Sequence, residues 1–338
     1  MKVLCIEKPG QLELKEFSKP ELQPGQAIIK VEMCGICGSD VTAYRGVNPT
    51  MKYPINGLGH EGVGVVVEVG ENPEGLKVGD RVALEPYVPC LKCHMCAEER
   101  WNNCADLHVC GVHKDGMMAE YFLHPTRQCF KIPDDMSFLH AALVEPFTIG
   151  LHGATRARVK AGEHVVVFGA GVIGLMASFA CINYGATPIL VDIIQERLDE
   201  AKEMGVPYVF NSKEGNVEDY LKEVTNGKLP EAMIDCTGAP AILGKMHDYV
   251  CHGGRIALIG WPHDPVLINT VRLMQKEIDV VPSRNSNKKF PEAIQLIHDG
   301  KLPVDALTTR TCKLDEVETV IQDMIKNPAN YLKVVVEI

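Results

Sequence analysis

Residues 164–174 have the sequence HVVVFGAGVIG, a short apolar run followed at once by glycines spaced as G-x-G-x-x-G. The run predicts a β-strand, and the apolar residues after Gly171 predict a helix that begins inside the glycine pattern. In this context Gly169 permits a tight turn, Gly171 lets the backbone approach a pyrophosphate, and Gly174 lets the helix pack closely on the strand. The expected dinucleotide-binding residues are Gly169, Gly171, Val172, Ile173 and Gly174.

A carboxylate ends the next apolar run, where the ribose of a bound dinucleotide would lie. Asp192 follows Gly174 by 18 residues, and it would accept hydrogen bonds from ribose hydroxyls and repel a 2′-phosphate. Asp192 therefore favours NAD over NADP, and Arg197 is expected among the cofactor-binding residues. The alternative is a glycine-rich turn in an α/β domain that binds no nucleotide.

The pattern of elements changes near residue 150. Continuous apolar strands alternate with helical segments from residue 164 onward, which is typical of a parallel sheet covered on both faces, a doubly wound Rossmann arrangement. Short β-branched runs with Gly and Pro between them precede this part and predict an antiparallel, barrel-like β domain. The expected strands are 27–32, 64–69, 81–84 and 118–123 in the first part and 164–168, 188–192, 232–236, 255–260 and 278–282 in the second.

A chain of 338 residues exceeds what one hydrophobic core usually supports, so two domains are expected. The final strand pattern, residues 331–338, could complete the sheet of the first domain, which makes the nucleotide domain an insertion. We therefore expect a catalytic domain at 1–150, a nucleotide domain at 151–286, and a C-terminal segment at 287–338 that returns to the catalytic domain.

Composition limits the partners and the compartment. A formal charge of −10 argues against nucleic acid or an anionic membrane surface, because both are bound mainly through clustered Lys and Arg. No run has the length and apolar character of a signal peptide or a membrane span, so a cytoplasmic protein is expected. The thirteen cysteines do not suggest a disulfide framework, because several have metal-ligand spacing and others stand singly among apolar residues.

Four cysteines in one short stretch are spaced C-x2-C-x2-C-x7-C. Four thiolates complete the tetrahedral shell of zinc and leave no open position, so this set predicts a structural zinc. A zinc-ribbon interaction module would also explain the cluster, but it would leave the glycine pattern unused. The ligands are Cys90, Cys93, Cys96 and Cys104.

A second metal site is indicated by Cys37 and by the triplet Gly59-His60-Glu61. Thiolate, imidazole and carboxylate together suit zinc, and three protein ligands with an exchangeable fourth position are typical of a catalytic site. The spacing of Cys34 and Cys37 could instead indicate a redox pair, but no βαβ pattern surrounds it.

These motifs together resemble the zinc-dependent medium-chain alcohol and polyol dehydrogenases over nearly the whole chain. The resemblance implies a GroES-like catalytic domain, an inserted Rossmann domain, a catalytic zinc on Cys37 and His60, and a structural zinc on the four-cysteine set. Glu145 stands where related alcohol dehydrogenases use a cysteine ligand, so the sorbitol dehydrogenase-like branch is favoured, with Glu61 and Glu145 as ligands that exchange with water. The motifs are GICGSD at 35–40, GHE at 59–61 and VEP at 144–146.

The resemblance also implies roles around the substrate. Ser39 matches the hydroxyl that passes the substrate proton toward solvent, while Thr42 departs from the histidine that often ends this relay. The residues expected to contact substrate are Tyr44, Arg45, Phe147 and Arg284. Arg284 has an alternative role as an ion-pair partner of Glu61 or Glu145.

The expected activity is NAD-linked oxidation of a secondary hydroxyl. Subgroup similarity favours a sugar acid oxidised at C5, as in bacterial L-gulonate and L-galactonate 5-dehydrogenases. The alternatives are a neutral polyol such as sorbitol or xylitol, and a threonine or butanediol type of alcohol. A nucleotide-binding sensor without turnover is disfavoured because Cys37, His60 and Glu145 are all present. A homodimer or homotetramer with two zinc ions per subunit is expected.

Overall fold

The computed structural model describes residues 1–338, which form two compact units. Unit 2 consists of Pro146–Lys289 with Lys301–Pro303, and unit 1 consists of Met1–Glu145, Phe290–Gly300 and Val304–Ile338. Unit 1 is therefore interrupted by unit 2, as the insertion of a nucleotide domain requires. The units separate after Glu145 and Lys289, whereas the predicted domain limits lie after residues 150 and 286.

Unit 1 contains a mainly antiparallel sheet with the strand order β16-β17-β3-β4-β5-β9, and β8 pairs with β3. Only β16 and β17 run parallel. Two small ladders, β1 with β2 and β6 with β7, complete the β structure. The strands are β1 Lys2–Lys8, β2 Gln11–Glu16, β3 Gln26–Ile36, β4 Glu61–Val69, β5 Arg81–Leu84, β6 Tyr87–Val88, β7 His108–Val109, β8 Tyr121–Pro125, β9 Cys129–Lys131, β16 Thr308–Lys313 and β17 Lys333–Glu337.

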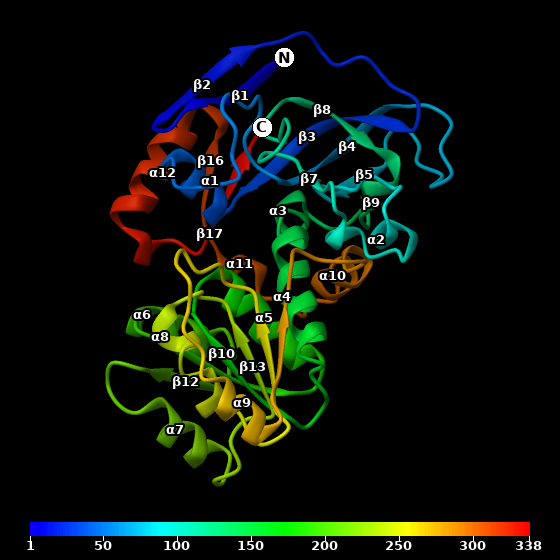
Figure 1. Cartoon of the computed structure of the whole chain (residues 1–338). Helices are drawn as coiled ribbons and strands as arrows, with labels where there is room; N and C mark the ends of the chain where they lie inside the picture. Colours follow the sequence, from blue (N-terminus) through cyan, green and yellow to red (C-terminus); the bar gives the residue numbers. More distant parts are fainter. The chain divides into compact units, whose positions relative to one another are not determined.

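The sheet joins segments from opposite ends of the chain. In Figure 1 the red strand β17 lies beside the blue strand β3, and Val334 pairs with Ile36 in antiparallel register. The expectation that the C-terminal strand completes the first domain's sheet is confirmed. The predicted strand at 118–123 is placed too early, because β8 begins at Tyr121. Met118 is buried, and its backbone is bonded to Leu4 and Leu58 instead of lying in β8.

Six α-helices belong wholly to unit 1. The amphipathic α12 buries Val317, Val320 and Ile321, which join the apolar core of this unit. The helices are α1 Gly38–Tyr44, α2 His94–Ala97, α3 Phe138–Ala141, α10 Phe290–His298, α11 Val304–Leu307 and α12 Val317–Lys326. Helix α4, Val144–Arg156, begins in unit 1 and continues in unit 2.

Unit 2 is a six-stranded parallel sheet with the order β12-β11-β10-β13-β14-β15. The first strand in sequence, β10, lies at the middle, which is the doubly wound order of a Rossmann fold and confirms the expected fold class. The strands are β10 His164–Phe168, β11 Thr187–Asp192, β12 Tyr208–Asn211, β13 Ala232–Asp235, β14 Arg255–Leu258 and β15 Asp279–Pro282. Strand β12 has no counterpart among the expected strands, because it is short and half exposed at the sheet edge.

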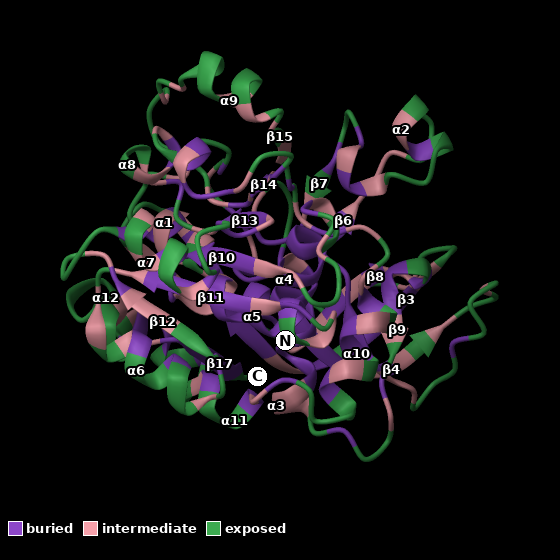
Figure 2. Ribbon diagram, turned by 90° about the horizontal axis from the view of Figure 1, so that it is seen from below, coloured by how far each residue is buried: buried purple, intermediate pink, exposed green.

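The inner strands of this sheet are the most buried part of unit 2. Figure 2 shows β10, β11 and β13 mainly in purple, while α9 has no buried residue and is mainly green. Helix α5 carries eight buried residues because it packs on β10 and β11 directly after the glycine pattern. The helices of unit 2 are α5 Val172–Asn183, α6 Gln195–Glu203, α7 Val217–Val224, α8 Pro240–Leu243 and α9 Thr270–Lys276. No helix combines the length and apolar character that crossing a bilayer requires.

Candidate active site

The glycine pattern forms the turn between β10 and α5. Gly169 has a φ of +98°, which an L side chain rarely adopts, and Gly171 is the N-cap of α5. A Cβ at Gly174 would lie 1.6 Å from the carbonyl oxygen of Gly169, so no side chain fits there. The positive end of α5 and these unobstructed backbone amides suit a pyrophosphate.

Asp192, at the end of β11, binds this turn directly. Its carboxylate accepts hydrogen bonds from the backbone amides of Ala170 at 2.5 Å, Ile193 at 2.7 Å and Ile194 at 3.0 Å. Asp192 therefore fixes the backbone of the turn between β10 and α5 and of the residues after β11, in addition to any contact with ribose. Arg197 lies in the first turn of α6, the helix that follows β11.

The second predicted site is formed by the facing ends of β3 and β4 in unit 1. Cys37 is the N-cap of α1, directly after β3, while His60 precedes β4 and Glu61 is its first residue. Ligand atoms of Cys37, His60 and Glu61 all lie within 4.8 Å of one another. A Cβ at Gly35, the strand partner of Glu61, would lie 1.9 Å from Glu61 Oε2, so glycine is needed for the carboxylate to cross β3.

Asp40 holds the cysteine in place. Its Oδ2 accepts a hydrogen bond from the backbone amide of Cys37 at 2.8 Å, and its Oδ1 lies 3.7 Å from His60 Nδ1. Burial lowers the pKa of His60, but Asp40 and Cys37 outweigh this and raise it well above its usual value. Burial also raises the pKa of Asp40. The site thus concentrates negative charge around one imidazole.

Two more carboxyl groups, those of Glu145 and Glu85, interact electrostatically with this cluster or with each other. The Tyr87 hydroxyl donates a hydrogen bond to Glu145 Oε1, and both side chains are buried. Burial raises the pKa of Glu145 to about 7, and neighbouring His60 opposes the shift. Burial and Glu145 together raise the pKa of Glu85 to about 8. Buried carboxyl groups with raised pKa values favour a bound cation.

A lysine lies against the opposite side of Glu61. Lys333 Nζ is 2.7 Å from each carboxylate oxygen of Glu61 and donates to the carbonyl of Ile36 at 3.0 Å. Burial lowers the pKa of Lys333, but the adjacent Glu61 carboxylate outweighs it, so the net pKa lies above the usual value.

The donor set of this site fits zinc. Thiolate, imidazole and carboxylate oxygen are its ordinary ligands, and the three donors converge, with His60 and Glu61 buried and Cys37 half-buried. Asp40 Oδ1 and His60 Nδ1 are buried without a hydrogen-bond partner, as expected for groups shaped around an ion. Glu145 is not in the group of atoms within 4.8 Å, so the structure brings together three of the four expected ligands most closely.

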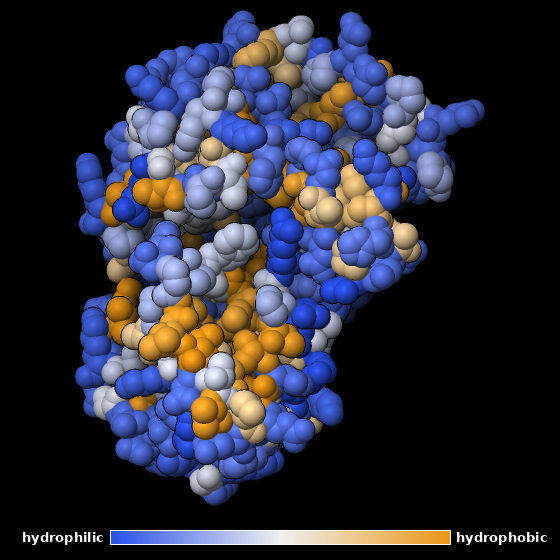
Figure 3. Space-filling view, in the orientation of Figure 1, coloured by the Kyte–Doolittle hydropathy of each residue, from blue (hydrophilic) through white to orange (hydrophobic).

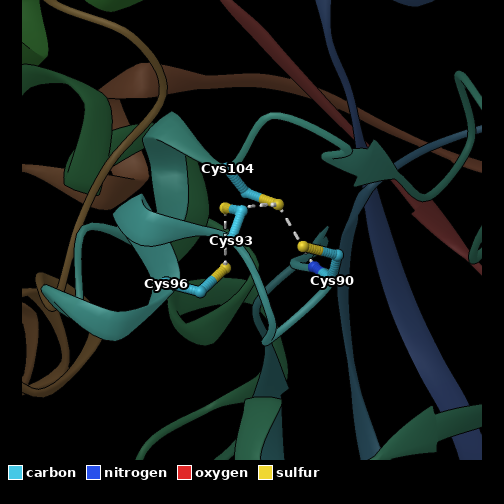
Figure 4. Close-up of side chains that lie close together, drawn as sticks. All are labelled: Cys90, Cys93, Cys96 and Cys104. Atoms are coloured by element: carbon cyan, nitrogen blue, oxygen red, sulfur yellow. Dashed lines mark hydrogen bonds between the residues drawn. The ribbon is translucent and has the colours of Figure 1, made fainter.

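Cys90, Cys93, Cys96 and Cys104, called the lobe cysteines below, also converge, as Figure 4 shows. Cys93 Sγ lies 3.6 Å from Cys96 Sγ and 4.0 Å from Cys104 Sγ, close to the separation of about 3.8 Å that tetrahedral Zn–S bonds of about 2.3 Å impose. The Cys90 amide lies 3.2 Å from Cys104 Sγ. Backbone amides, those of Ala105 and Cys96, lower the pKa of Cys93 to about 6, so the loop favours thiolate before any metal binds.

Comparison with known proteins agrees with this geometry. Residues 23–134 match the alcohol dehydrogenase GroES-like domain, and residues 172–299 match the zinc-binding dehydrogenase domain. A zinc-type alcohol dehydrogenase-like protein of Haemophilus influenzae is 41% identical over 99% of this chain and 98% of its own. The chain belongs to the zinc-dependent medium-chain alcohol and polyol dehydrogenase family.

Named members of this dehydrogenase family act on polyols and the corresponding ketoses. Sorbitol dehydrogenase of Bacillus subtilis is 31% identical, with 99% of this chain and 97% of the relative covered. D-xylulose reductase of Morganella morganii is 33% identical, with 94% and 96% covered. The likeness to gulonate enzymes is not among these findings, whereas the sorbitol dehydrogenase-like branch is supported.

Two solved dehydrogenases contain nicotinamide cofactors. The alcohol dehydrogenase rspB of Escherichia coli CFT073, complexed with NADH, is 34% identical with a TM-score of 0.94, covering 100% of this chain and 99% of that one. A zinc-binding dehydrogenase of Sinorhizobium meliloti 1021, bound to NADP, is 30% identical with a TM-score of 0.92 and the same coverage. The family therefore includes members with either dinucleotide.

The predicted substrate residues have different environments in this dehydrogenase. Tyr44 is buried. Its hydroxyl donates a hydrogen bond to Glu318 Oε1 at 3.1 Å and accepts one from Gln322 Nε2 at 2.9 Å, both on α12. Phe147 is completely buried. Both side chains are packed against protein in this structure, and their role toward substrate stays a prediction. Arg45 and Arg284 are exposed, and the partner of Glu61 is Lys333 instead of Arg284.

Sequence reasoning missed four residues of this dehydrogenase site. Asp40 lies within the quoted GICGSD motif but received no role, and Glu85 and Tyr87 follow directly after a predicted strand. Lys333 interrupts the apolar final strand. A charged residue inside such a strand is a usable signal, because lysine is almost never fully buried without a partner.

Proposed function

We propose that this dehydrogenase uses NAD and zinc to oxidise a secondary hydroxyl of a linear polyol, of the sorbitol or xylitol type, reversibly to the ketose. The observation that carries the proposal is the close convergence of Cys37, His60 and Glu61, with Glu145 beside it, in a chain similar to sorbitol dehydrogenase. When bound, zinc would polarise the substrate hydroxyl and NAD would accept the hydride.

The chain's own residues would hold and deprotonate the substrate. Cys37, His60 and a carboxylate of Glu61 or Glu145 would hold the zinc. Ser39 would take the hydroxyl proton, and its Oγ is buried without a hydrogen-bond partner, which supports its availability for a relay. The Thr42 hydroxyl donates to the Ser39 carbonyl at 2.9 Å, so the proton would leave by another route.

The choice of NAD rests on Asp192. Its carboxylate lies at the end of β11 and would repel a 2′-phosphate, while Gly169, Gly171, Val172, Ile173 and Gly174 would face the pyrophosphate. Arg197 would contribute from α6.

A sugar acid oxidised at C5 is the second candidate substrate. Arg284 is exposed in unit 2, and the neighbouring Ser283 and Ser286 hydroxyls are buried without hydrogen-bond partners, a polar environment that a carboxylate could use. Arg45 supplies another exposed positive charge. The threonine or butanediol type of substrate has no specific observation in its favour.

Steady-state kinetics test both candidates. We expect kcat/KM with NAD to be higher for sorbitol or xylitol than for L-gulonate, L-galactonate, L-threonine or 2,3-butanediol. Preference for an aldonate that Arg284→Ala abolishes would replace the polyol by the sugar acid. Lack of turnover of every secondary alcohol by a protein with two zinc ions per subunit would overturn the proposed activity.

We further propose a homodimer formed through unit 2. Strand β15 is the outer strand of the sheet, and α9 has no buried residue. Exposed apolar side chains gather here, and Figure 3 shows orange side chains on the part of unit 2 that carries α9. A second copy could pair with β15 and cover Leu267, Met274, Trp261 and Val271, which are 92%, 78%, 70% and 59% exposed.

Light scattering tests the assembly. We expect a dimer or a tetramer built from it, and Met274→Glu with Val271→Glu should yield monomers. A monomeric wild type would overturn this proposal. We also propose a cytoplasmic location, supported by thirteen cysteines of which none forms a disulfide in this structure.

A further inference from the structure

The proposed reaction gives no role to Asp235, a completely buried carboxylate at the end of β13. Strand β13 lies beside β10 (Figure 1), and Asp235 pairs with Phe168, the residue directly before the turn between β10 and α5, called the glycine turn below. On the other side of β10, Phe168 pairs with Val191, and Asp192 follows as the last residue of β11. Two carboxylates, Asp192 and Asp235, therefore end the two strands that neighbour the glycine turn.

The Asp235 carboxylate binds the turn that follows its own strand, residues 236–239. Its Oδ2 accepts a hydrogen bond from the Gly238 amide at 2.9 Å. Its Oδ1 accepts hydrogen bonds from the Thr237 hydroxyl at 2.6 Å and from the Thr237 amide at 3.2 Å. The Thr237 hydroxyl accepts a further hydrogen bond from the Ala239 amide at 3.0 Å. Because a buried carboxylate is costly without such donors, these bonds hold residues 236–239 in one conformation.

The turn at 236–239 is in close contact with two neighbouring turns. A Cβ at Gly169 would lie 2.9 Å from the Thr237 methyl group, so the glycine turn has no room for a side chain there. The Asp235 carbonyl accepts a hydrogen bond from the Gly260 amide at 3.0 Å, in the turn after β14. A Cβ at Gly260 would lie 2.1 Å from the Gly238 nitrogen. The turns after β10, β13 and β14 therefore pack backbone against backbone, with Asp235 bonded to two of them.

The order of the strands indicates which part of a dinucleotide this turn would meet. A doubly wound sheet is built of two halves, each of which takes one mononucleotide at the carboxyl ends of its strands. Strands β10, β11 and β12 form the half that ends in Asp192, where the adenosine ribose is expected. Strands β13, β14 and β15 form the other half. The turn that Asp235 holds is therefore on the nicotinamide side of the glycine turn.

We propose that Asp235 is a positioning residue for the nicotinamide half of the cofactor. This inference rests on the proposed dinucleotide site at the glycine turn. Asp235 is completely buried, so it would act through the backbone of residues 236–239 and not by touching the cofactor. A turn that is already ordered requires no binding energy to fix it, and it holds the nicotinamide where the hydride is accepted.

Titrations with NADH and with AMP, which carries only the adenosine half, test the proposal. Asp235→Asn keeps one acceptor oxygen but loses the charge and the second acceptor. It should weaken NADH binding about tenfold, the effect of losing one hydrogen bond to a charged group, and leave AMP binding unchanged. Asp192→Asn, the matched control on the adenosine side, should weaken both ligands. Unchanged NADH affinity in Asp235→Asn, or an equal loss of affinity for AMP, would overturn the inference.

The fluorescence of bound NADH gives a second readout, because its emission reports the environment of the nicotinamide ring. At saturating NADH the emission of Asp235→Asn should shift toward that of free NADH, whereas that of Asp192→Asn should match wild type. A role of Asp235 in stability alone would lower the unfolding temperature without changing this emission. Wild-type emission in Asp235→Asn would therefore contradict the positioning role.

The inference and the proposed cofactor site fail in different ways. If Gly171→Ala leaves NADH affinity unchanged, the proposed cofactor site is wrong. If Gly171→Ala weakens NADH binding and Asp235→Asn does not, the site stands and the role of Asp235 is wrong. Thr237→Val decides the inference if Asp235→Asn does not fold, because Thr237 is exposed and valine keeps the methyl group while removing the donor to Asp235. It too should weaken NADH binding but not AMP binding, and unchanged NADH affinity would overturn the inference.

Discussion

The Tyr87 hydroxyl donates a hydrogen bond to Glu145, and both groups are buried beside the Cys37 and His60 site. Tyr87→Phe keeps the ring but removes the donor. We expect it to weaken zinc binding at this site about tenfold and to cost about 1 to 2 kcal/mol of stability. Chelator competition and urea unfolding measure the two effects. Unchanged zinc affinity would mean that Glu145 needs no orientation by Tyr87.

The lobe cysteines should hold a zinc ion that is independent of the catalytic one. Cys93→Ser leaves three thiolates and should reduce the metal content from two zinc ions per subunit to one. The unfolding temperature should fall as well, because structural zinc binding contributes to the free energy of folding. Cys37→Ser is the matched control, which should lose the other ion. An unchanged metal count in Cys93→Ser would remove the structural assignment.

The glycine turn offers two alanine variants with different outcomes. A Cβ at Gly171 meets nothing within 4 Å, so Gly171→Ala should fold normally but obstruct a pyrophosphate. A Cβ at Gly174 collides with the Gly169 carbonyl, so Gly174→Ala should lose both stability and NAD binding. Thermal unfolding together with titration of NADH fluorescence separates the two. NADH affinity in Gly171→Ala equal to that of wild type would place the cofactor elsewhere.

Replacement of Asp192 should separate charge from loop geometry. Asp192→Asn keeps an oxygen that can accept from the Ile193 and Ile194 amides, whereas Asp192→Ser loses most of these bonds. Both should improve kcat/KM for NADP relative to NAD, because the repulsion of a 2′-phosphate is removed. Only Asp192→Ser should also destabilise unit 2. A wild-type enzyme that prefers NADP would show that the assignment of Asp192 is wrong.

His124 should make stability depend on pH. It is buried, and burial lowers its pKa to about 4, while its Nε2 lies 2.9 Å from the Glu85 carbonyl. The unfolded chain binds a proton below about pH 6.5 but the folded protein only below about pH 4, so the free energy of unfolding falls as pH drops between these values. The full loss is about 3 kcal/mol.

His124→Gln cannot titrate in this range and is the comparison. The difference in unfolding free energy between wild type and variant should shrink from pH 7 to pH 5. A constant difference would show that His124 is not held neutral by burial.

Local sequence patterns predicted the parts of the fold that depend on neighbouring residues. The strand and helix around Gly169 and Gly174, and the convergence of the four lobe cysteines, follow from spacing within short segments. Strand β12 was not predicted, because Tyr208–Asn211 is short and half exposed and lacks the continuous apolar pattern of a central strand.

The contacts that could not be predicted join distant segments. Lys333 meets Glu61 only because β17 pairs with β3, and Tyr44 is covered only because α12 packs on α1. No pattern near Tyr44 indicates that Glu318 and Gln322 will take its hydroxyl. The family resemblance indicated the candidate zinc ligands. Which side chains hydrogen-bond to Glu61 and to Tyr44 depends on the pairing of distant strands and the packing of distant helices.

The pairing of β17 with β3 also bears on the order in which the protein is made. Lys333 and its partner on β3, Ile36, are 297 residues apart, so during synthesis β3 and β4 emerge long before the strand that carries the counter-ion of Glu61. Unit 2 consists almost entirely of one continuous segment and can form in the meantime. We expect the catalytic unit to close last, so that a chain released early would carry a nucleotide domain beside an unfinished metal site.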